Sequence, residues 1–498
     1  MTFIEYMALS PAQRVAYKVK EFFQLLPGRL KAFFVAIGNF LKKFVLGVGA
    51  GIKDFGLRFA KGDIATKLSY VVMGFGNFTR GQAGKGIIFL ALEVLYILYM
   101  ANFGMTYISQ FGTLGTQGQT QVIGANGRPQ TVPGDNSMLI LLYGTMTILI
   151  TVVFLGIYIA NTKSAYQAEQ NIKFGRKNPG LKEELADLLD GKYHITMLSL
   201  PVLLISVFTI LPLAFMVLIA FTNYDKAHTP PANLFTWVGL DTFKDVFKIT
   251  EGASKGYTFL ELTKWTIVWA IFATFTNYIL GMVLALMINK KSIKLKSLWR
   301  TLFVVTIAVP QFVSLLLMKQ MLQDDGVVNV ILGYMGIPAI SFFNGSKLVA
   351  RVTVIVINMW VGVPYTILQT SGILMNIPED LYESARIDGA TPVVQFFKIT
   401  LPYMLFVTTP YLIQNFVSNI NNFNVIYLLT NGGPQKDPNL YQAGQTDLLV
   451  TWLFKLTMDS NDYNTAAAVG ILVFIVCATL SLITFNMSKS SRNEEEFS

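Results

Sequence analysis

The sequence has little charge and almost no metal-binding chemistry. Asp, Glu, Lys and Arg account for 14% of its 498 residues, against 53% hydrophobic residues. A soluble fold of this length does not normally hide so much apolar surface, so the composition indicates a membrane protein. The chain has one cysteine, Cys477, and two histidines. These numbers exclude a disulfide within the chain and a Cys/His cluster for a soft metal, and we expect Cys477 to be an unreactive core thiol.

The chain also lacks the phosphate-binding loop of an ATPase. No G-x-x-x-x-G-K-[ST] run occurs, and GQAGKG, which begins at Gly81, lacks the first spacing of that motif. Basic and aromatic residues are not interleaved in the pattern typical of nucleic-acid binding. We therefore expect no cofactor and no nucleic acid on this chain.

Long apolar runs, in contrast, are abundant. About 20 helical residues cross the ~30 Å hydrocarbon layer of a bilayer with every backbone polar group satisfied internally. Eight runs are long enough, and no alternating pattern of barrel strands competes with them. We predict an all-α integral membrane protein with eight transmembrane helices. The predicted spans are approximately Gly86–Ile108, Ser137–Ala160, Ile195–Thr222, Thr263–Ile288, Thr301–Leu322, Val352–Ser371, Tyr403–Tyr427 and Asn464–Phe485.

Lysine and arginine indicate the orientation, because cytoplasmic loops are enriched in both. The short loop Asn289–Arg300 contains Lys and Arg but no acidic residue. Placing this loop in the cytoplasm puts both termini and most of the basic residues there. The net charge of +10 also favours attraction to anionic lipid. We predict a multi-pass protein of the cytoplasmic membrane.

The predicted spans divide the chain into four parts. Residues 1–85 form a basic cytoplasmic or interfacial region, 86–193 hold two accessory spans and a cytoplasmic connector, 194–486 form a six-helix core, and 487–498 form a cytoplasmic tail. Apolar residues recur at helical spacing in the first part, at Phe33, Ile37, Phe40, Phe44 and Val48. They favour an amphipathic helix along the inner leaflet, with packing on the protein's own cytoplasmic loops as the alternative.

Three features outside the core give further expectations. The segment Phe111–Asn136 is rich in Gly, Thr and Gln and is predicted to be a flexible external loop. The external loop Asn223–Leu262 is too short for a folded domain of its own. Glu93 is the clearest acidic residue inside a predicted span, and we expect it to form an interhelical hydrogen bond or to lie near the membrane surface.

The segment Ile377–Pro402, between the sixth and seventh predicted spans, has the punctuation of two short helices. Pro378 and the two acidic residues after it suit a first helical turn. Gly389 suits the left-handed conformation that ends a helix, while Thr391 and Pro392 suit the N-cap and first position of the next. We predict a helix–bend–helix that projects from the membrane and fits a groove, with an ordinary cytoplasmic loop as the alternative.

These residues resemble the EAA signature of bacterial ABC importer permeases, which reads EAA, then G, then I-x-L-P. The matching runs are Glu383-Ser384-Ala385, Asp388-Gly389-Ala390 and Ile399-Thr400-Leu401-Pro402, with Ser384 where the family has Ala. The resemblance implies that residues 377–402 form the coupling loop, which sits in a cleft of a separate ATPase subunit. It implies that Glu383 makes an ion-pairing or capping contact and that Gly389 provides the bend.

Four further runs resemble the MalF-type permease subunit of maltose and other oligosaccharide importers. They are FTNYD at Phe221, WVGLDTF at Trp237, LLTNGGP at Leu428 and TDLLVTWLF at Thr446. The resemblance implies a MetI/MalF-like six-helix core that translocates maltose or maltodextrin, with galacto-oligosaccharides as the alternative. It also implies the partners: a second, MalG-like permease subunit, a dimer of MalK-like ATPase subunits and an external sugar-binding protein.

Polar residues gather in the seventh predicted span, close to an aromatic group in the sixth. Sugar sites combine hydrogen-bonding groups with flat apolar platforms. Asn415, Ser418, Asn419 and Asn422 share one helical face, which favours a cavity lining over interhelical contacts. Asn415 and Ser418 differ in residue type from the family's contact positions. The substrate-binding residues that the resemblance implies are Trp360, Gly362, Tyr365, Asn415, Ser418, Asn419 and Asn422.

Two other classes of membrane protein remain as alternatives. An ion-coupled secondary transporter needs titratable relays or broken cation-binding helices near the midplane, and the predicted core shows neither clearly. A scaffold that only binds an ATPase does not need a polar seventh span. We predict a transport subunit that is not itself an enzyme.

Overall fold

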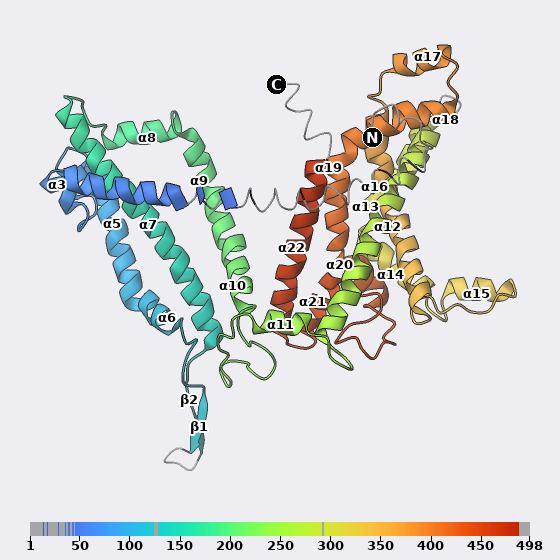
Figure 1. Ribbon diagram of the computed structural model, residues 1–498, viewed down its shortest axis with the longest axis horizontal. Helices are drawn as coiled ribbons and strands as arrows, with labels where there is room; N and C mark the ends of the chain where they lie inside the picture. The colour runs from blue at the N-terminus through green and yellow to red at the C-terminus, as the bar shows by residue number, and fades with distance from the viewer. Residues whose placement is uncertain are drawn as a thin grey trace. The chain divides into compact units, whose positions relative to one another are not determined.

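The computed structural model describes residues 13, 17, 28, 35, 38–39, 42–43, 45–123, 128–290 and 293–487. Four residues of the apolar N-terminal pattern, Phe33, Ile37, Phe40 and Phe44, lie outside these ranges, as do the tail residues 488–498. The chain divides into two compact units, Met1–Gly112 with Met138–Ala214, and Thr113–Ser137 with Phe215–Ser498. Figure 1 shows that the described elements are predominantly helices.

Helical residues 45–61 open the first unit. The elements up to the third long helix are α3 (Ile64–Leu68), α4 (Phe75–Phe78), α5 (Ala83–Tyr99), the π-helical turn η1 (Met100–Gly104), α6 (Met105–Gln110), β1 (Thr120–Ile123), β2 (Pro129–Val132), α7 (Ser137–Lys173), α8 (Leu181–Leu189), α9 (Tyr193–Ile205), η2 (Ser206–Ile210) and α10 (Leu211–Ile219). The remaining elements are α11 (Asp241–Phe247), α12 (Lys255–Asn289), α13 (Lys296–Ala308), α14 (Gln311–Met321), α15 (Val327–Tyr334), α16 (Lys347–Leu374), α17 (Glu379–Ile387), α18 (Pro392–Gln395), η3 (Phe396–Thr400), α19 (Leu401–Ile420), α20 (Phe423–Thr430), α21 (Leu449–Met458) and α22 (Tyr463–Met487).

The structure confirms the all-α membrane fold class. Within the described residues, seven helices are long and apolar enough to cross a membrane, or eight if the bent pair α13–α14 counts as one span. The fifth predicted span, Thr301–Leu322, is therefore not one straight helix: α13 and α14 meet at 89°. Val309 is extended because it precedes Pro310, whose ring disfavours the helical conformation of the residue before it. The predicted count of eight is not confirmed.

The seventh predicted span is also interrupted. The helix α19 ends at Ile420, and Asn422 takes a non-helical conformation and caps α20 by accepting a hydrogen bond from the Val425 N–H at 3.3 Å. The break falls inside the polar cluster, where amide side chains can satisfy freed backbone groups. Asn415, Ser418 and Asn419 thus share a helix, and Asn422 belongs to the break that follows.

The segment predicted as a flexible loop, Phe111–Asn136, contains a two-stranded antiparallel hairpin. In its register Thr120 pairs with Val132, and Ile123 pairs with Pro129. All the residues of both strands are exposed. The high Gly and Gln content led us to expect irregular structure, whereas short runs such as TQVI suit an extended strand.

The core of the second unit is built on α12, which packs against α16 and α19. Gly281 of α12 permits this approach, because a Cβ there would lie 2.5 Å from the Cβ of Thr366 on α16. Small residues commonly allow membrane helices to pack closely. Trp269 of α12 is fully buried, and its indole N–H donates to the carbonyl of Asn419 at 3.1 Å. These contacts fix the face of α12 that looks onto α16 and α19.

The first unit is built on the pair α5 and α7. Tyr96 and Phe154 stack with ring centroids 3.8 Å apart, and the hydroxyls of Tyr99 and Thr147 lie 2.9 Å apart. The hydrogen bond expected for Glu93 is present, but it links α5 to the N-terminal segment: its carboxylate accepts the backbone N–H of Met73 at 2.8 Å.

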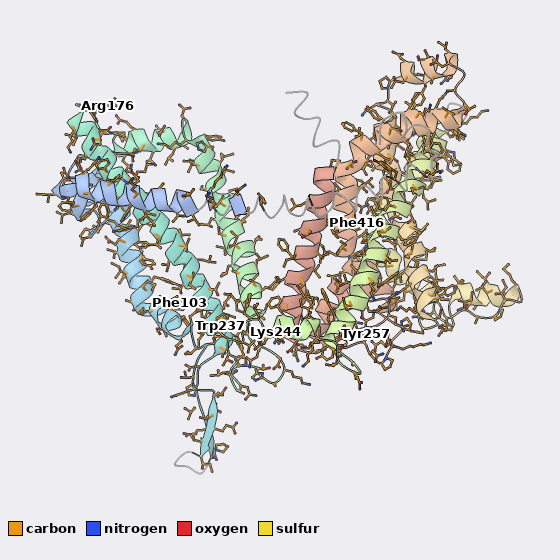
Figure 2. All side chains as sticks on the ribbon, viewed as in Figure 1. Phe103, Arg176, Trp237, Lys244, Tyr257 and Phe416 are labelled. Atoms are coloured by element: carbon orange, nitrogen blue, oxygen red, sulfur yellow. The ribbon has the colours of Figure 1, made fainter. Side chains whose placement is uncertain are left out.

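Cys477 is a free, buried thiol of α22, which agrees with its expected place in the core. Figure 2 marks Lys244 of α11 and Tyr257 near the start of α12, two elements that pack together at one end of the core. The helix α17 lies at the other end (Figure 1). The helices α11 and α17 therefore mark two opposite ends of the core.

Candidate substrate cavity and coupling loop

A polar cavity of about 450 Å³ lies between α12, α16, α19 and the start of α20. Six of the seven predicted substrate residues line it: Gly362, Tyr365, Asn415, Ser418, Asn419 and Asn422. These residues come from positions up to sixty apart in sequence, and the packing of α12 against α16 and α19 is what assembles them. The cavity has the polar lining that recognition of hydroxyl groups requires.

The amide side chains of the cavity form a connected chain. The Asn419 amide donates to the Thr274 hydroxyl at 3.0 Å and to the Asn415 amide oxygen at 3.4 Å. The Asn422 amide donates to the Asn419 oxygen at 3.4 Å. Asn419 is almost fully buried, so its orientation is fixed by these bonds. These linked amides hold several hydrogen-bond donors and acceptors at the cavity wall in a defined arrangement.

Gly362 gives the cavity its depth on the α16 side. A Cβ at this position would lie 2.2 Å from the amide nitrogen of Asn277, a distance that side chains do not tolerate. The absence of a side chain therefore lets Asn277 of α12 reach the cavity between the two helices. This gives a packing reason for the glycine that the sequence resemblance singled out.

Sequence reasoning missed Asn277 and Asn358, which also line the cavity. They are 5% and 4% exposed, and the Asn277 oxygen and the Asn358 amide nitrogen have no hydrogen-bond partner among the described residues. A buried polar atom without a partner costs about 1–3 kcal/mol. Each is a single amide in an apolar helix, and such an amide equally suits a contact between helices. Only its place in the cavity wall, with Gly362 and Asn415, distinguishes it from such a contact.

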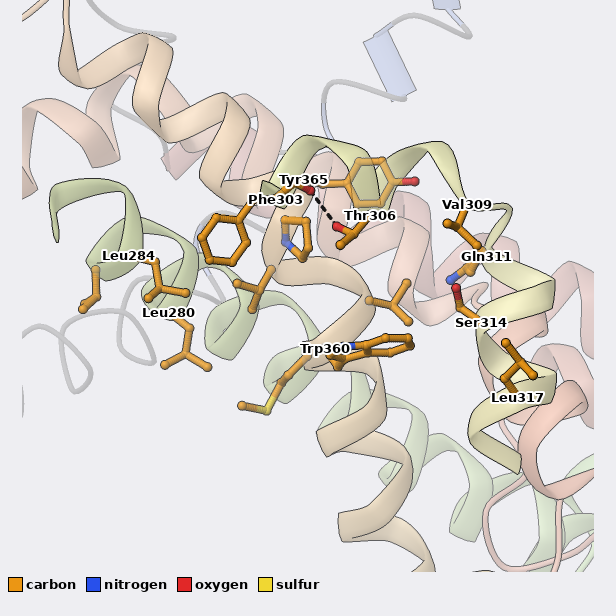
Figure 3. Close-up of a pocket in the computed structure, with 15 residues that line it drawn as sticks. Leu280, Leu284, Phe303, Thr306, Val309, Gln311, Ser314, Leu317, Trp360 and Tyr365 are labelled. Atoms are coloured by element: carbon orange, nitrogen blue, oxygen red, sulfur yellow. Dashed lines mark hydrogen bonds between the residues drawn. The ribbon is translucent and has the colours of Figure 1, made fainter. Parts of the chain in front are cut away.

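Trp360 lies in a second, neighbouring cavity. This apolar cavity of about 610 Å³ is lined by residues of α12, α13, α14 and α16 (Figure 3). Figure 3 shows Trp360 and Tyr365 in its wall, with the Thr306 hydroxyl donating to the Phe303 carbonyl at 2.6 Å. Tyr365, Val361 and Gln311 line both cavities, so the two adjoin along this border. Six predicted residues thus meet in one cavity, while Trp360 belongs to the apolar one beside it.

The coupling loop has the two helices and the bend that the sequence predicts. α17 begins after Pro378, and Gly389 has φ +76°, the left-handed conformation that glycine tolerates best. Thr391 caps α18 by accepting the Val394 N–H at 3.4 Å, with Pro392 at the first turn. The Tyr382 hydroxyl lies 2.8 Å from the Thr400 hydroxyl and ties α17 to η3.

The tip of this loop is open to solvent. Glu383, Ser384, Asp388 and Gly389 are exposed, and Ala385 and Ala390 are half-buried. Within the part of the chain that the structure describes, no ion pair involves Glu383. The Ile387 side chain is 87% exposed. An exposed large apolar residue among small ones on a projecting helix is the pattern of a docking surface.

The runs LLTNGGP and TDLLVTWLF meet at the opposite end of the core. The Lys455 ammonium lies 2.7 Å from the Asp447 carboxylate and donates to the Asn431 carbonyl at 2.8 Å. Gly432 has φ +79°, and a Cβ there would lie 2.1 Å from an Asp447 oxygen. Both members of the ion pair are buried, so removing one partner would leave the other charge uncompensated. This buried pair fixes the connection between α20 and α21.

The fold and the cavity define a multi-pass membrane transport subunit, and comparisons with known proteins give its family. The profile described as "Binding-protein-dependent transport system inner membrane component" matches residues 277–490. The galactooligosaccharides transport system permease protein GanP of Bacillus subtilis is 35% identical over 428 residues, which cover 85% of this chain and 97% of GanP. The maltodextrin permease MdxF of the same organism is 34% identical over 436 residues, covering 85% and 95%.

The chain belongs to this family of inner membrane components and is a sugar permease subunit of an ABC importer. As such it is a transport subunit and not an enzyme. The maltose/maltodextrin permease MalF of Klebsiella aerogenes is 36% identical over 257 residues, covering 51% of this chain and 49% of MalF. Among solved structures, a chain of a bacterial alginate ABC transporter, in complex with a periplasmic protein bound to alginate pentasaccharide, shares the fold. It has a TM-score of 0.50 and 23% identity over 61% of this chain and 96% of its own.

Proposed function

We propose that this subunit translocates an oligosaccharide, with maltose and maltodextrins as the first candidates, through the polar cavity between α12, α16 and α19. The observation that carries the proposal is the convergence of Gly362, Tyr365 and the amide cluster of α19 on one cavity. Sugars present many hydroxyl groups, each of which is both donor and acceptor, and the connected amides match them. A galacto-oligosaccharide is the second candidate, because GanP is as similar to this chain as MdxF is.

The adjoining apolar cavity supplies the second half of a sugar site. Pyranose rings have apolar faces that pack on aromatic side chains, while their edges make hydrogen bonds. Tyr365 stands on the border between the cavities, and Trp360 lies on the apolar side. We infer that the sugar passes along this border, with its hydroxyls toward Asn419 and Asn422.

The importer that this proposal requires has several other subunits. We propose that a second, MalG-like permease completes the pathway and that a MalK-like ATPase dimer, which holds ATP and Mg²⁺, receives the coupling loop 377–402. An external sugar-binding protein delivers the substrate. Both termini then lie in the cytoplasm, and the core 194–486 is preceded by the accessory helices of 86–193 and the basic region 1–85. The exposed tip of α17 supports the docking of the ATPase at one end of the core.

Uptake measurements on the assembled importer test the substrate proposal. We expect labelled maltodextrins to be taken up in preference to galacto-oligosaccharides, and Asn419→Leu with Asn422→Leu to lower uptake by on the order of tenfold, because each lost hydrogen bond is worth about 0.5–1.5 kcal/mol. Asn102→Leu, at an exposed amide of η1, is the matched control. Normal uptake by the double variant at normal membrane abundance would refute the cavity assignment, and preference for galacto-oligosaccharides would select the second candidate.

A further inference from the structure

Helical residues 45–61 run across α5 and α7 instead of along them (Figure 1). The helix is held in place from one side. The Arg58 guanidinium is buried, donates to the Thr162 hydroxyl of α7 at 3.3 Å and pairs with Asp54 at 3.0 Å. The rings of Phe55 and Phe59 pack edge-on against Tyr70, at 4.9 and 5.1 Å between centroids. The orientation of this helix relative to α7 is therefore fixed by specific contacts.

The segment that follows this helix attaches at the level where two predicted spans end. The backbone N–H of Gly74 donates to the Asn161 side chain at 2.8 Å, and the Asn161 amide donates to the Ser69 carbonyl at 2.8 Å. Gly74 also approaches Gly86, since a Cβ on Gly74 would lie 2.1 Å from the Gly86 carbonyl oxygen. The apolar run of the first span begins at Gly86, and that of the second ends at Ala160. Both contacts place the segment at the boundary of the hydrocarbon layer.

One side of the helix exposes a row of apolar residues, and Leu46 and Leu57 are exposed on another side of it. Val45, Val48, Ile52 and Phe59 recur at helical spacing and are all exposed, with Ile52 at 67%. Ile64 of α3 is also exposed, at 78%. Phe59 packs against Tyr70 as well, whereas Val45, Val48 and Ile52 stay exposed beside it. Several large apolar side chains exposed on one segment mark an interaction site.

Charge and continuity indicate what covers this face. Lys53, Lys61 and Lys67 are exposed along the same segment. At the start of α5, Ile87 and Ile88 of the first predicted span are exposed too. Lysines flanking an apolar stripe at the membrane boundary suit phospholipid, because the stripe enters the acyl region and the ammonium groups reach anionic headgroups.

We propose that helical residues 45–61 and α3 form a membrane-surface anchor that binds anionic phospholipid and sets the depth of α5 and α7 in the bilayer. The anchor is distinct from the substrate cavity and needs no transport activity. Lysines near an anionic surface strengthen binding to it. The anchor is consequently sensitive to lipid composition.

Depth-dependent fluorescence quenching tests the anchor on the full-length chain. The native thiol is removed by Cys477→Ala, and a fluorophore is attached to Ile52→Cys or, as the matched control, to Ala50→Cys, which lies about 200° further round the same helix. The chain is placed in nanodiscs of phosphatidylcholine alone or mixed equally with phosphatidylglycerol, with brominated acyl chains as quencher. We expect several-fold stronger quenching at Ile52 than at Ala50, and stronger quenching with phosphatidylglycerol.

Charge reversal then separates lipid from other occupants. Lys53→Glu, Lys61→Glu and Lys67→Glu together should abolish the phosphatidylglycerol dependence and leave the membrane abundance unchanged. Equal quenching at both positions, or quenching at Ile52 that disappears when the partner subunits are added, would overturn the proposal; the latter would assign the face to a subunit. Sugar uptake does not enter this measurement, so its outcome is independent of the substrate proposal.

Discussion

The substrate cavity and the coupling loop are built in opposite ways. Residues of the cavity, such as Asn419 and Asn277, are buried and held by partners on other helices or by close packing. Residues of the loop tip, such as Glu383 and Asp388, are exposed, and the bonds that shape the loop run between residues close in sequence. The cavity is thus defined by contacts between helices of this chain, whereas the loop tip presents exposed groups and is shaped by contacts between residues close in sequence.

This difference separates two kinds of loss of function. A substitution in the cavity wall disturbs packing and binding together, because the same atoms serve both. We expect the exchange of an exposed side chain at the loop tip, such as Glu383, to leave the packing of this chain unchanged and to remove a contact with another subunit. Stability and uptake, measured on the same variants, should therefore both fall where a cavity residue is tightly packed, as at Gly362, whereas only uptake should fall for Glu383.

The largest effect is expected for Gly362→Leu. The new side chain would start 2.2 Å from the Asn277 nitrogen and fill the cavity, so both α12–α16 packing and the substrate path would be lost. Overpacking costs about 1–3 kcal/mol, and we expect uptake to be abolished and the thermal midpoint of the purified chain to fall. Gly372→Leu is the matched control, because it lies on the same helix with no atom within 4 Å of a new Cβ. A variant at Gly362 that folds and transports normally would contradict the close approach of α12 and α16.

The next largest effects on uptake are expected for substitutions at the tip of the loop. Gly389→Pro forces φ to about −65° where the structure has +76° and removes the N–H that donates to the Arg386 carbonyl at 3.0 Å. Glu383→Lys reverses a charge that is exposed and makes no ion pair within the described residues. We expect both to abolish sugar uptake while membrane abundance, and for Glu383→Lys also the thermal midpoint, stay at the level of the unaltered protein.

The exposed residue Glu251 provides the control for the charge change, as Glu251→Lys. The sugar-stimulated ATPase rate of the assembled importer and the uptake rate are measured side by side. Unchanged uptake by both loop variants would remove the coupling assignment, whereas a lowered thermal midpoint for Glu383→Lys would show that the tip is part of this chain's own packing.

The loop could be predicted almost completely from the sequence, and the cavity only in part. The bend at Gly389 and the cap at Thr391 are local: a left-handed glycine and a Thr-Pro pair act within a few residues of themselves. The amide cluster of α19 was recognisable because its members crowd one short stretch. Asn277 carries no such signal, since a single amide in an apolar helix equally suits a contact between helices.

Two features of the structure have simple geometric causes. Trp360 and Gly362 are two positions apart, which places them about 200° from each other around a helix, so they cannot face one cavity. The break between α13 and α14 follows from Pro310, whose effect on Val309 outweighs the apolar run around it. Hydropathy predicts that a segment lies in the membrane, but it does not predict whether the helix is continuous.

The smallest effect, and the most discriminating, is expected for Asn277→Leu. The Asn277 oxygen is buried without a partner among the described residues, so replacing the amide by an apolar group of similar size should leave stability unchanged or raise it by up to about 1 kcal/mol. If that oxygen accepts a sugar hydroxyl during transport, the uptake rate should fall by roughly 2- to 10-fold. Thr276→Val, at the half-buried neighbouring position of α12, is the control. Opposite signs for stability and uptake would mark Asn277 as a binding residue; a destabilised variant with normal uptake would make it a packing residue of the α12–α16 pair.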